Sequence, residues 1–374
     1  MNTIFIDSFS GLSDPRVERT KKHLLLDIIA ISICGLLSGA ENWEEISDFA
    51  VSHQSWFASF LTLPNGIPSH DTISRVFSAL DPEAFQLCSM TWLQRIRSFL
   101  PENIVALDGK TLRGSKRANT CKKALHIINA WSCKNSICLG QVKVADKSNE
   151  IPAVPELLKL LYIKGAIVTL DAMGAQENTV KQICDADADY VIALKGNQSA
   201  LHETVKDSFS FHDAGSNTLS VYRADDEVSG SHGRVEERFI EVIDTKQLQG
   251  QIDNRWTNLR SIARITYTRI EPSATITEQR YYISSLVPDE PEAILCAIRS
   301  HWLVENCLHW SLDVTFKEDQ CRIRDENAAV NFSWLRKFGL GLLKNEVSFK
   351  ASIRRKQRKA CTDIRYLQKV IAQI

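Results

Sequence analysis

The chain has 374 residues, of which 44% are hydrophobic and 24% are charged, and its 45 basic side chains balance 45 acidic ones. This length exceeds one comfortable hydrophobic core, so two lobes or one core domain with an insertion are expected, and the composition excludes a largely disordered protein. The zero net charge excludes a uniformly basic nucleic-acid-binding surface, and the ten cysteines contain no CxxC pair that would predict a zinc ribbon.

The first hundred residues are predicted to be helical. Residues 24–40 form an apolar run that is short and contains Asp27, which predicts a buried helix rather than a membrane span. A second helical pattern covers residues 42–61, and a third follows Ser69 as its N-cap. Its apolar stripe is Ile73, Val76, Phe77 and Leu80. The exposed polar side chains of this third helix, including Arg75, are compatible with a helix-turn-helix DNA reader, while a helical cap that only packs stays open as the alternative.

Beyond about residue 103 the periodicity changes to short apolar runs. Strands are predicted within residues 103–109, 124–133, 137–145, 165–174 and 190–198, and helices within 154–161 and 178–186. This alternation predicts a mixed α/β core. Two of the runs, IVALD and IVTLD, end in Asp108 and Asp171. Both aspartates are therefore expected at the carboxyl edge of the sheet, where ligands of open α/β sheets bind.

Strand-like alternation returns between about residues 218 and 286. Four segments carry it: SVYRADDEV, RVEERFIEVI, RSIARITYTRI and EQRYYISSL. Helical patterns resume at about Pro291 and continue to the end of the chain. A β-rich block is thus predicted as an insertion before a helical C-terminal part.

Three acidic residues are candidates for metal chemistry. Asp108 and Asp171 end predicted strands, and Glu305 lies on a predicted helix. Carboxylates suit Mg2+, and two such ions can activate a water or a 3′-hydroxyl and stabilise the leaving oxygen of a phosphodiester. Taken singly, each aspartate is also compatible with a turn or a helix N-cap.

The segment HWLVENCLHWSLDVTFKED, residues 301–319, is read as a regular helix. A 3.6-residue period places His301, Glu305 and His309 on one stripe, so that an imidazole flanks the carboxylate one turn away on each side. A zinc site of these three residues and a half-buried ion pair stay open as alternatives, although the His-Glu-x-x-His spacing of zincin helices is absent. The side chains expected to anchor this helix against the sheet are Trp302, Leu308, Trp310 and Leu312, and Asp313, Glu318 and Asp319 are supporting acids without an assigned role.

Basic residues gather in two places. One cluster directly follows Asp108 and contains Lys110, Arg113, Lys116, Arg117, Lys122 and Lys123. The other is the tail from residue 336, which holds eleven Lys and Arg residues against two acidic ones. Such clusters bind phosphates without sequence preference, although a solvated basic surface is the plain alternative.

Several motifs together resemble one known family. VALDGKTLRGS, VTLDAMGAQ, YVIALKGNQ, HWLVENCLHWSLDVTFKED and NFSWLRKFGLGLLK, in this order, resemble DDE-type insertion-sequence transposases of the H-repeat-associated group. The resemblance implies a ribonuclease H-like mixed-sheet core with a β-rich insertion, and a catalytic triad of Asp108, Asp171 and Glu305 that binds Mg2+ or Mn2+. It implies four regions: an N-terminal helical, DNA-end-binding domain (1–98), the first part of the core (99–215), the β-rich insertion (216–288) and a helical completion with a basic tail (289–374).

The expected function is that of a transposase that binds terminal inverted repeats and catalyses metal-dependent cleavage and strand transfer. The alternatives are a catalytically silent transposase-derived DNA-binding protein and a structure-directed nuclease. Candidate DNA contacts are Arg75, Lys110, Arg113, Lys116, Arg117, Lys195, Asn197, His301, Arg322, Arg324, Arg336 and Lys337.

The expected partner is double-stranded DNA, bound by a homodimer, without an organic cofactor or a membrane, in the bacterial cytoplasm at the nucleoid. Related elements carry a tyrosine seven and an arginine four residues before the glutamate, and a lysine seven residues after it. Here these positions hold Ile298, His301 and Leu312, which leaves the cleavage pathway open.

Overall fold

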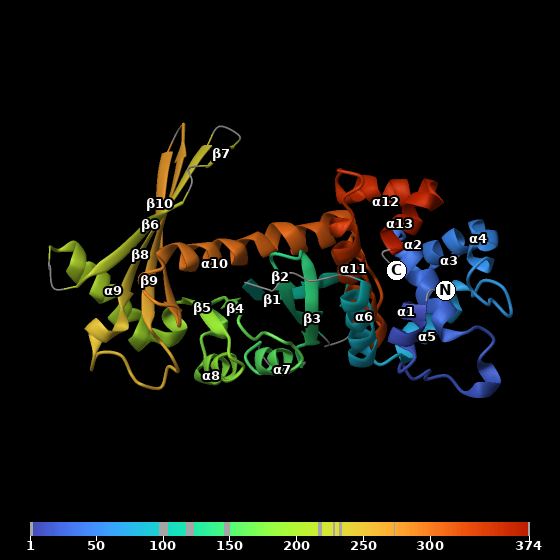
Figure 1. Cartoon of the computed structure of the whole chain (residues 1–374), viewed down its shortest axis with the longest axis horizontal. Helices are drawn as coiled ribbons and strands as arrows, with labels where there is room; N and C mark the ends of the chain where they lie inside the picture. Colours follow the sequence, from blue (N-terminus) through green and yellow to red (C-terminus); the bar gives the residue numbers. More distant parts are fainter. Residues whose placement is uncertain are drawn as a thin grey trace.

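One twisted sheet runs through most of the molecule, with helices on both faces and a helical bundle at one end (Figure 1). The computed structural model describes residues 3–96, 104–116, 123–145, 150–215, 219–226, 229–231, 234–272 and 274–372. The strands are β1 (Ile104–Leu112), β2 (Leu125–Ser132), β3 (Ile137–Lys143), β4 (Ile167–Leu170), β5 (Asp189–Leu194), β6 (Val221–Asp225), β7 (Ser229–Ser231), β8 (Arg234–Asp244), β9 (Ser261–Glu271) and β10 (Ala274–Ser284).

The helices fall into three groups along the chain. The N-terminal group contains α1 (Thr3–Phe9), α2 (Leu25–Leu37), α3 (Trp43–Ser52), α4 (Gln54–Ala58), α5 (His70–Ala79) and α6 (Pro82–Ile96). The helices between strands are α7 (Ala153–Lys159), α8 (Glu177–Asp185) and α9 (Ser199–Asp213). The C-terminal group contains α10 (Pro291–Val304), α11 (Glu326–Asn345), α12 (Ile353–Thr362) and α13 (Ile364–Ala372).

The first five strands form the predicted mixed core. Their order in the sheet is β3-β2-β1-β4-β5, with β1, β2 and β3 antiparallel and with β4 parallel to both β1 and β5. This is the ribonuclease H-like arrangement that the resemblance implied, so the predicted fold class is confirmed. The parallel strands bring the residues that follow β4 beside the middle of β1.

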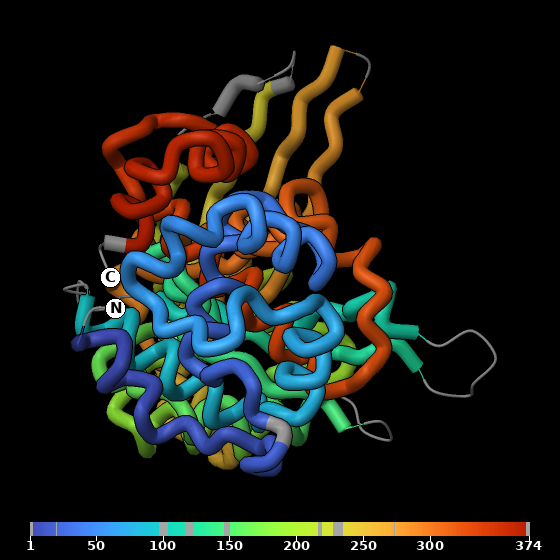
Figure 2. The backbone as a smooth tube through the Cα atoms, turned by 90° about the vertical axis from the view of Figure 1, so that its right-hand side faces the viewer, coloured from blue at the N-terminus to red at the C-terminus, as the bar shows by residue number. Residues whose placement is uncertain are grey.

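The β-rich block continues the same sheet. Strands β6, β8, β9 and β10 correspond to the four predicted segments, and the short β7 adds a further pairing with β8. β10 pairs with β5, so that the sheet order continues β5-β10-β9-β8-β6. The β9–β10 hairpin extends away from the helices that cover the core (Figures 1 and 2).

The two faces of the sheet have different covers. Side chains of α7, α8 and α9 pack with alternate residues of β1, β4 and β5, such as Val105, Leu107 and Leu170. On the other face, α10 packs on strand residues that include Ile104 and Val191. Because side chains alternate along a strand, Asp108 shares the α10 face with Ala106.

The N-terminal and C-terminal helices share one hydrophobic core. It joins α2, α3, α5 and α6 to α11 and α13, with Trp43 packed against both Phe77 and Phe332. The apolar run at residues 24–40 forms the buried helix α2, and no described helix is long and apolar enough to cross a membrane. The predicted N-cap of α5 is confirmed, since the Ser69 hydroxyl accepts a hydrogen bond from the backbone N–H of Thr72. The end view in Figure 2 shows these helices gathered at one end.

Candidate active site

Asp108 and Asp171 lie side by side on neighbouring strands. β1 and β4 run parallel, with Ala106 opposite Thr169. Asp108 and Asp171 each come two residues later, so they continue the same register. β4 ends at Leu170, as predicted, but β1 does not end at Asp108. It continues to Leu112 because β2 pairs with it over its whole length, with Asn129 opposite Asp108. Asp108 is therefore a mid-strand residue that borders open space only on the side where β4 has ended.

The segment that carries Glu305 is not a regular α-helix. α10 ends at Val304, and two π-helical turns follow, Glu305–His309 and Ser311–Thr315. Of the stripe predicted from a 3.6-residue period, the contact between Glu305 and His309 is confirmed, whereas His301 lies elsewhere. Insertion of such turns is frequent at functional sites.

His309 joins Glu305 to Asp108. Its Nδ1 atom lies 3.1 Å from Glu305 Oε2 and 3.5 Å from Asp108 Oδ2. The imidazole is buried, whereas the Glu305 side chain is 75% exposed. Burial lowers the pKa of His309, and its hydrogen bond to Glu305 opposes this shift. A neutral imidazole here holds the glutamate against the aspartate.

His301 does not take part in this contact. Its Nδ1 atom lies 3.0 Å from the hydroxyl of Thr169 on β4, and burial lowers its pKa to about 4. The imidazole pair expected around Glu305, and with it the zinc trio, is therefore wrong. The group of possible metal ligands that converges among the described residues is Asp108, Glu305 and His309, with ligand atoms within 4.8 Å of one another.

Asp108 is held in an environment that opposes its negative charge. Burial raises its pKa to about 7, and the charges of Asp171, Glu150 and Glu305 add to the effect, although the N–H of Gly109 donates to it. A carboxylate of this kind is destabilised until a cation or a proton neutralises it. Several negative charges that lie close together without a positive partner indicate a functional site rather than a structural one.

Asp171 caps the turn that follows β4. Its Oδ1 accepts the N–H of Met173 at 3.0 Å, so the carboxylate is fixed at the sheet edge. Burial and, next, the charge of Glu150 raise its pKa, whereas backbone hydrogen bonds and the charge of Lys195 lower it. Asn197, a predicted DNA contact, instead donates to the carbonyl oxygen of Ala172 at 2.6 Å and so secures the same turn.

The supporting acids of residues 301–319 now have partners. Lys110 is buried beside Asp108, and its Nζ donates to both oxygens of Asp313 at 2.7 and 2.6 Å. This pair fixes the second π-helical turn to β1. Asp319 lies 3.4 Å from the exposed Arg113, and the buried Glu318 accepts a hydrogen bond from Ser333.

The anchoring of the same segment differs in part from the prediction. Leu308 and Leu312 are fully buried, as expected. Trp310 is 57% exposed and lies on the side opposite to the buried Leu308, so its prediction as an anchor is wrong. Trp302 is half-buried and lies under two guanidinium groups, those of Arg280 at 5.1 Å and Arg238 at 5.8 Å.

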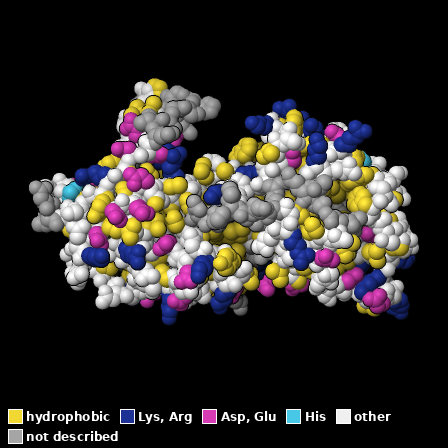
Figure 3. Space-filling model, in the orientation of Figure 1, with side chains coloured by type: hydrophobic (Ala, Val, Ile, Leu, Met, Phe, Trp, Pro, Cys, Tyr) yellow, Lys and Arg dark blue, Asp and Glu magenta, His cyan; other side chains and the backbone are white. Residues whose placement is uncertain are grey.

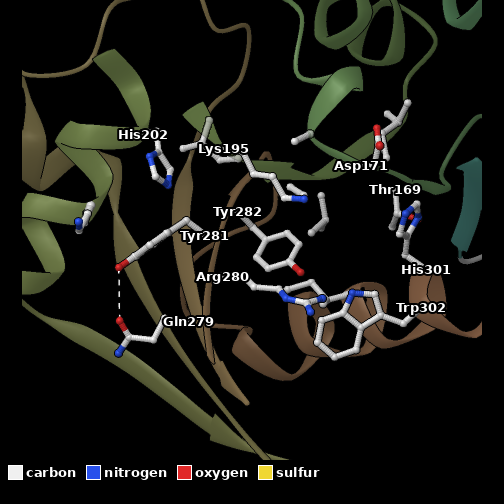
Figure 4. Close-up of a pocket in the computed structure, with 17 residues that line it drawn as sticks. Thr169, Asp171, Lys195, His202, Gln279, Arg280, Tyr281, Tyr282, His301 and Trp302 are labelled. Carbon is white, nitrogen blue, oxygen red and sulfur yellow. Dashed lines mark hydrogen bonds between the residues drawn. The ribbon is translucent and has the colours of Figure 1, made fainter. Parts of the chain in front are cut away.

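A pocket opens beside Asp171. Figure 4 shows Lys195, Arg280 and Trp302 around it, with Asp171 and His301 at its inner side. Its other lining groups include His202, Lys206, Tyr281 and Tyr282, which come from α9 and β10. The insertion therefore contributes one wall, from β10, to a basic, aromatic cavity that reaches Asp171.

The remaining predicted DNA contacts divide by burial. Lys116, Lys195, Arg75, Arg322 and Arg324 are exposed, and the last two line a groove together with Ser74 of α5. Arg117 lies outside the described residues.

Arg336 and Lys337 are buried, so the expectation that they contact DNA is corrected. Arg336 packs on the Phe332 ring, and the Lys337 ammonium donates to Gln141 at 2.6 Å. α11 is covered on all sides, by β3 and by N-terminal helices.

Sequence reasoning missed Glu150 and His126. Glu150 stands just before α7, and its charge acts on both aspartates, as described above. No periodicity or motif marks it, because its position depends on how the chain before α7 returns to the sheet edge.

The residues present fit a divalent cation. Most donors at the sheet edge are carboxylate oxygens, which hard cations such as Mg2+ prefer, with the His309 imidazole beside them, and the repulsion among the carboxylates would be relieved by a positive charge. Asp108, Asp171 and Glu305 are the residues that would hold it, with His309 in contact with two of them.

Comparisons with known proteins agree with this geometry. The family model described as Transposase DDE domain matches residues 100–340, and the model described as DDE_Tnp_1-associated matches residues 6–93. The "H repeat-associated putative transposase YhhI" of Escherichia coli (strain K12) is 39% identical over 98% of this chain and 97% of its own length. The "Putative transposase YncI" of Escherichia coli O157:H7 is 38% identical over 98% of this chain and 94% of its own.

Among solved structures, a piggyBac transposase synaptic complex with hairpin DNA covers 98% of this chain and 77% of its own, with a TM-score of 0.41 and 12% identity. That likeness is too weak to bear on the fold, which rests on the strand order described above. With family matches that span most of the chain and relatives aligned over almost all of it, the chain belongs to the DDE transposases, in the group of H-repeat-associated elements.

Proposed function

We propose that this chain binds the terminal inverted repeats of a mobile element and carries out cleavage and strand transfer of DNA with Asp108, Asp171 and Glu305. The observation that carries the proposal is the convergence of these three acids, from two neighbouring strands and a π-helical turn, at one edge of the sheet. The raised pKa of Asp108 and Asp171 supports it, because that charge is unfavourable without a cation.

The proposed cation is Mg2+ or Mn2+. Two ions bound by these carboxylates would activate a water or a 3′-hydroxyl and stabilise the leaving oxygen. The protein's part is to hold the carboxylates in place. His309 fixes Glu305, Lys110 fixes the second π-helical turn through Asp313, and backbone N–H groups fix Asp108 and Asp171.

The pocket beside Asp171 is the proposed place for the DNA strand that reacts. Lys195, Lys206 and Arg280 supply positive charge around it, and Trp302 and the two tyrosines offer faces on which a base can stack. A phosphate held by Lys195 would lie next to Asp171, whose pKa is lowered by the charge of this lysine.

The helical end of the molecule is the proposed region for end recognition. The region 1–98 would read the terminal repeat, with Arg75 of α5 exposed and with Arg322 and Arg324 in the adjoining groove. Exposed arginines of α12 add positive charge on this end, where Figure 3 shows Lys and Arg gathered at the surface. Pairing of two element ends requires two active sites, so a homodimer on DNA is part of the proposal.

The test is cleavage of a duplex that carries the element's own end, in Mg2+ or Mn2+. Asp108→Asn, Asp171→Asn and Glu305→Gln should each reduce cleavage by at least about a thousandfold while DNA binding in EDTA stays within twofold. The matched control is Asp187→Asn, which alters an exposed aspartate at the opposite end of β5 and should leave cleavage unchanged.

Three outcomes separate the alternatives. Equal cleavage of a scrambled duplex would indicate a structure-directed nuclease. Binding without cleavage by the unmodified chain would indicate a silent DNA-binding protein. Full activity of Asp108→Asn would overturn the assignment of the acidic centre.

A further inference from the structure

The outer side of the segment that carries Glu305 is apolar. Leu303 near the end of α10, Trp310 between the two π-helical turns and Val314 in the second turn are each at least half exposed. Single exposed apolar residues are common, but three large ones on one side of a helical segment indicate a binding surface. Trp310 is the most informative of them. The other seven tryptophans, all within the described residues, are buried or half-buried.

Trp310 lies in the turn directly after Glu305. Its backbone N–H donates to the carbonyl oxygen of Glu305, five residues earlier, which is the hydrogen bond that defines a π-helical turn. Its neighbour His309 is buried and contacts both Glu305 and Asp108. One turn therefore directs an imidazole inward to the acidic centre and an indole outward to solvent, next to a carboxylate that is itself exposed.

The surroundings of Trp310 suit DNA. The second π-helical turn packs against α12, whose Arg354, Arg355 and Arg358 are exposed, and Figure 1 shows α12 beside the end of the long helical segment. Arginines bind phosphates, and an indole offers a face on which a base stacks. A second copy of the chain seated on this apolar surface would instead cover Glu305, which the reacting DNA has to reach.

We propose that Trp310 stacks on a base of the reacting DNA strand, on the other side of the scissile phosphate from the base held in the pocket beside Asp171. The inference rests on the proposed function, which gives Trp302 of that pocket a base to stack on. Trp302 comes three residues before Glu305 and Trp310 five residues after it, so two indoles bracket the carboxylate. Neighbouring bases stacked on separate rings would hold the phosphodiester between them at the metal centre, which makes Trp310 a positioning residue.

The experiment measures the single-turnover cleavage rate of a duplex that carries the element's own end and its flanking sequence. Trp310→Ala should slow cleavage by about tenfold to a hundredfold, the effect of losing one stacked base, whereas Trp310→Phe keeps a ring and should stay within about threefold. Tyr162→Ala is the matched control, since it removes an exposed aromatic ring just after α7 and should leave the rate unchanged. Circular dichroism of each variant checks that the fold is retained.

Abasic nucleotides, placed one at a time along the reacting strand, test the contact itself. At the position that Trp310 contacts, the missing base should slow cleavage by the unmodified chain and cause little further loss in Trp310→Ala. At other positions the losses from the DNA change and the protein change should multiply. A purely structural role of Trp310 would give multiplied losses at every position and would overturn the proposal.

Three further outcomes are decisive. A normal cleavage rate of Trp310→Ala would overturn this inference and leave the acidic triad intact. Sedimentation velocity without DNA tests the other occupant, because a dimer of the unmodified chain that dissociates in Trp310→Ala would make the apolar surface a protein interface and overturn base stacking. No cleavage by the unmodified chain would overturn the proposed function, and with it the inference.

Discussion

Charged side chains gather in the helical bundle and at the acidic edge of the sheet, and their neighbours differ in sign. In the helical bundle, each buried charge has a partner. Lys337 donates to Gln141, and Glu318 accepts from Ser333. Lys356 donates to the carbonyl oxygen of Leu343 at 2.7 Å, and a carboxylate oxygen of Glu346 accepts the Tyr366 hydroxyl at 2.7 Å.

At the sheet edge the acidic side chains repel one another. Asp108 and Asp171 have raised pKa values, and Glu150 and Glu305 add negative charge near them. Burial of paired charge holds a fold together, whereas burial of like charge lowers stability and is retained where a ligand compensates it. The sign and the partners of the neighbouring groups, more than burial itself, distinguish the functional region from the structural one.

Substitution of a buried charge in the bundle should strongly lower the stability of the protein. Lys337→Met keeps the length of the side chain but removes the ammonium, which leaves Gln141 without its donor and Glu318 without its positive neighbour. The free energy of unfolding should fall by about 2–4 kcal/mol, as measured by urea denaturation. Lys350→Met, at an exposed lysine of the same tail, is the control and should stay within about 0.5 kcal/mol of the unmodified chain. Equal stability of the two variants would contradict the contrast between the regions.

At the acidic edge, the same kind of change should stabilise the protein. The pKa of Asp108 is about 7 in the folded chain against an ordinary value of 3.8, so its protonated form stabilises the fold at low pH and this contribution is lost as pH rises through about 7. In EDTA at pH 8, Asp108→Asn should therefore raise the free energy of unfolding by about 1–3 kcal/mol.

The difference between Asp108→Asn and the unmodified chain should shrink as pH is lowered toward 4, because the folded aspartate is then protonated and no longer repelled by its neighbours. Addition of Mg2+ should stabilise the unmodified chain and leave the variant unchanged. Thermal unfolding across this pH range checks both statements, and a variant less stable than the unmodified chain at pH 8 would count against repulsion at the centre.

Helix α12 contains both kinds of charge and allows a third test. Lys356 is buried and paired, whereas Arg354, Arg355 and Arg358 are exposed. Replacing these three arginines with glutamine should weaken binding to any duplex by about tenfold and reduce the slope of log affinity against log salt by up to about three.

The matched control for α12 lies on the other side of the molecule. Lys159, Lys164 and Lys181 are exposed on or near α7 and α8, which Figure 1 places away from α12. Their replacement with glutamine changes net charge equally and should leave DNA affinity within about twofold. Equal losses in the two triple variants would indicate a general charge effect instead of a binding surface.

Much of this architecture was predictable from local patterns. Period-two alternation located β6, β8, β9 and β10 of the β-rich block, and the Ser69 N-cap and the strand end at Asp171 follow from short-range hydrogen bonding. These features depend on neighbours in sequence, so the residues themselves carry the signal.

The features that sequence missed depend on contacts between distant segments. β1 continues past Asp108 because β2 pairs with it, and Lys337 is buried because β3 and the N-terminal helices enclose α11. Glu150 meets His126 of β2 across 24 positions of the sequence, a contact that no local pattern predicts. A basic residue in a basic tail is predicted to be exposed to solvent unless its packing partners are known.

The segment with the π-helical turns gives a further pair of predictions, and the smallest expected effect is that of Trp310→Ala. Trp310 and Leu308 are two residues apart, but Leu308 is fully buried and Trp310 is largely exposed. Leu308→Ala should cost about 2–5 kcal/mol of the free energy of unfolding, while Trp310→Ala should cost less than about 1 kcal/mol despite the larger side chain. Urea denaturation of the two variants measures both changes in the free energy of unfolding. A regular α-helix with Trp310 packed as an anchor would reverse this order, because loss of a buried tryptophan costs at least as much as loss of a buried leucine.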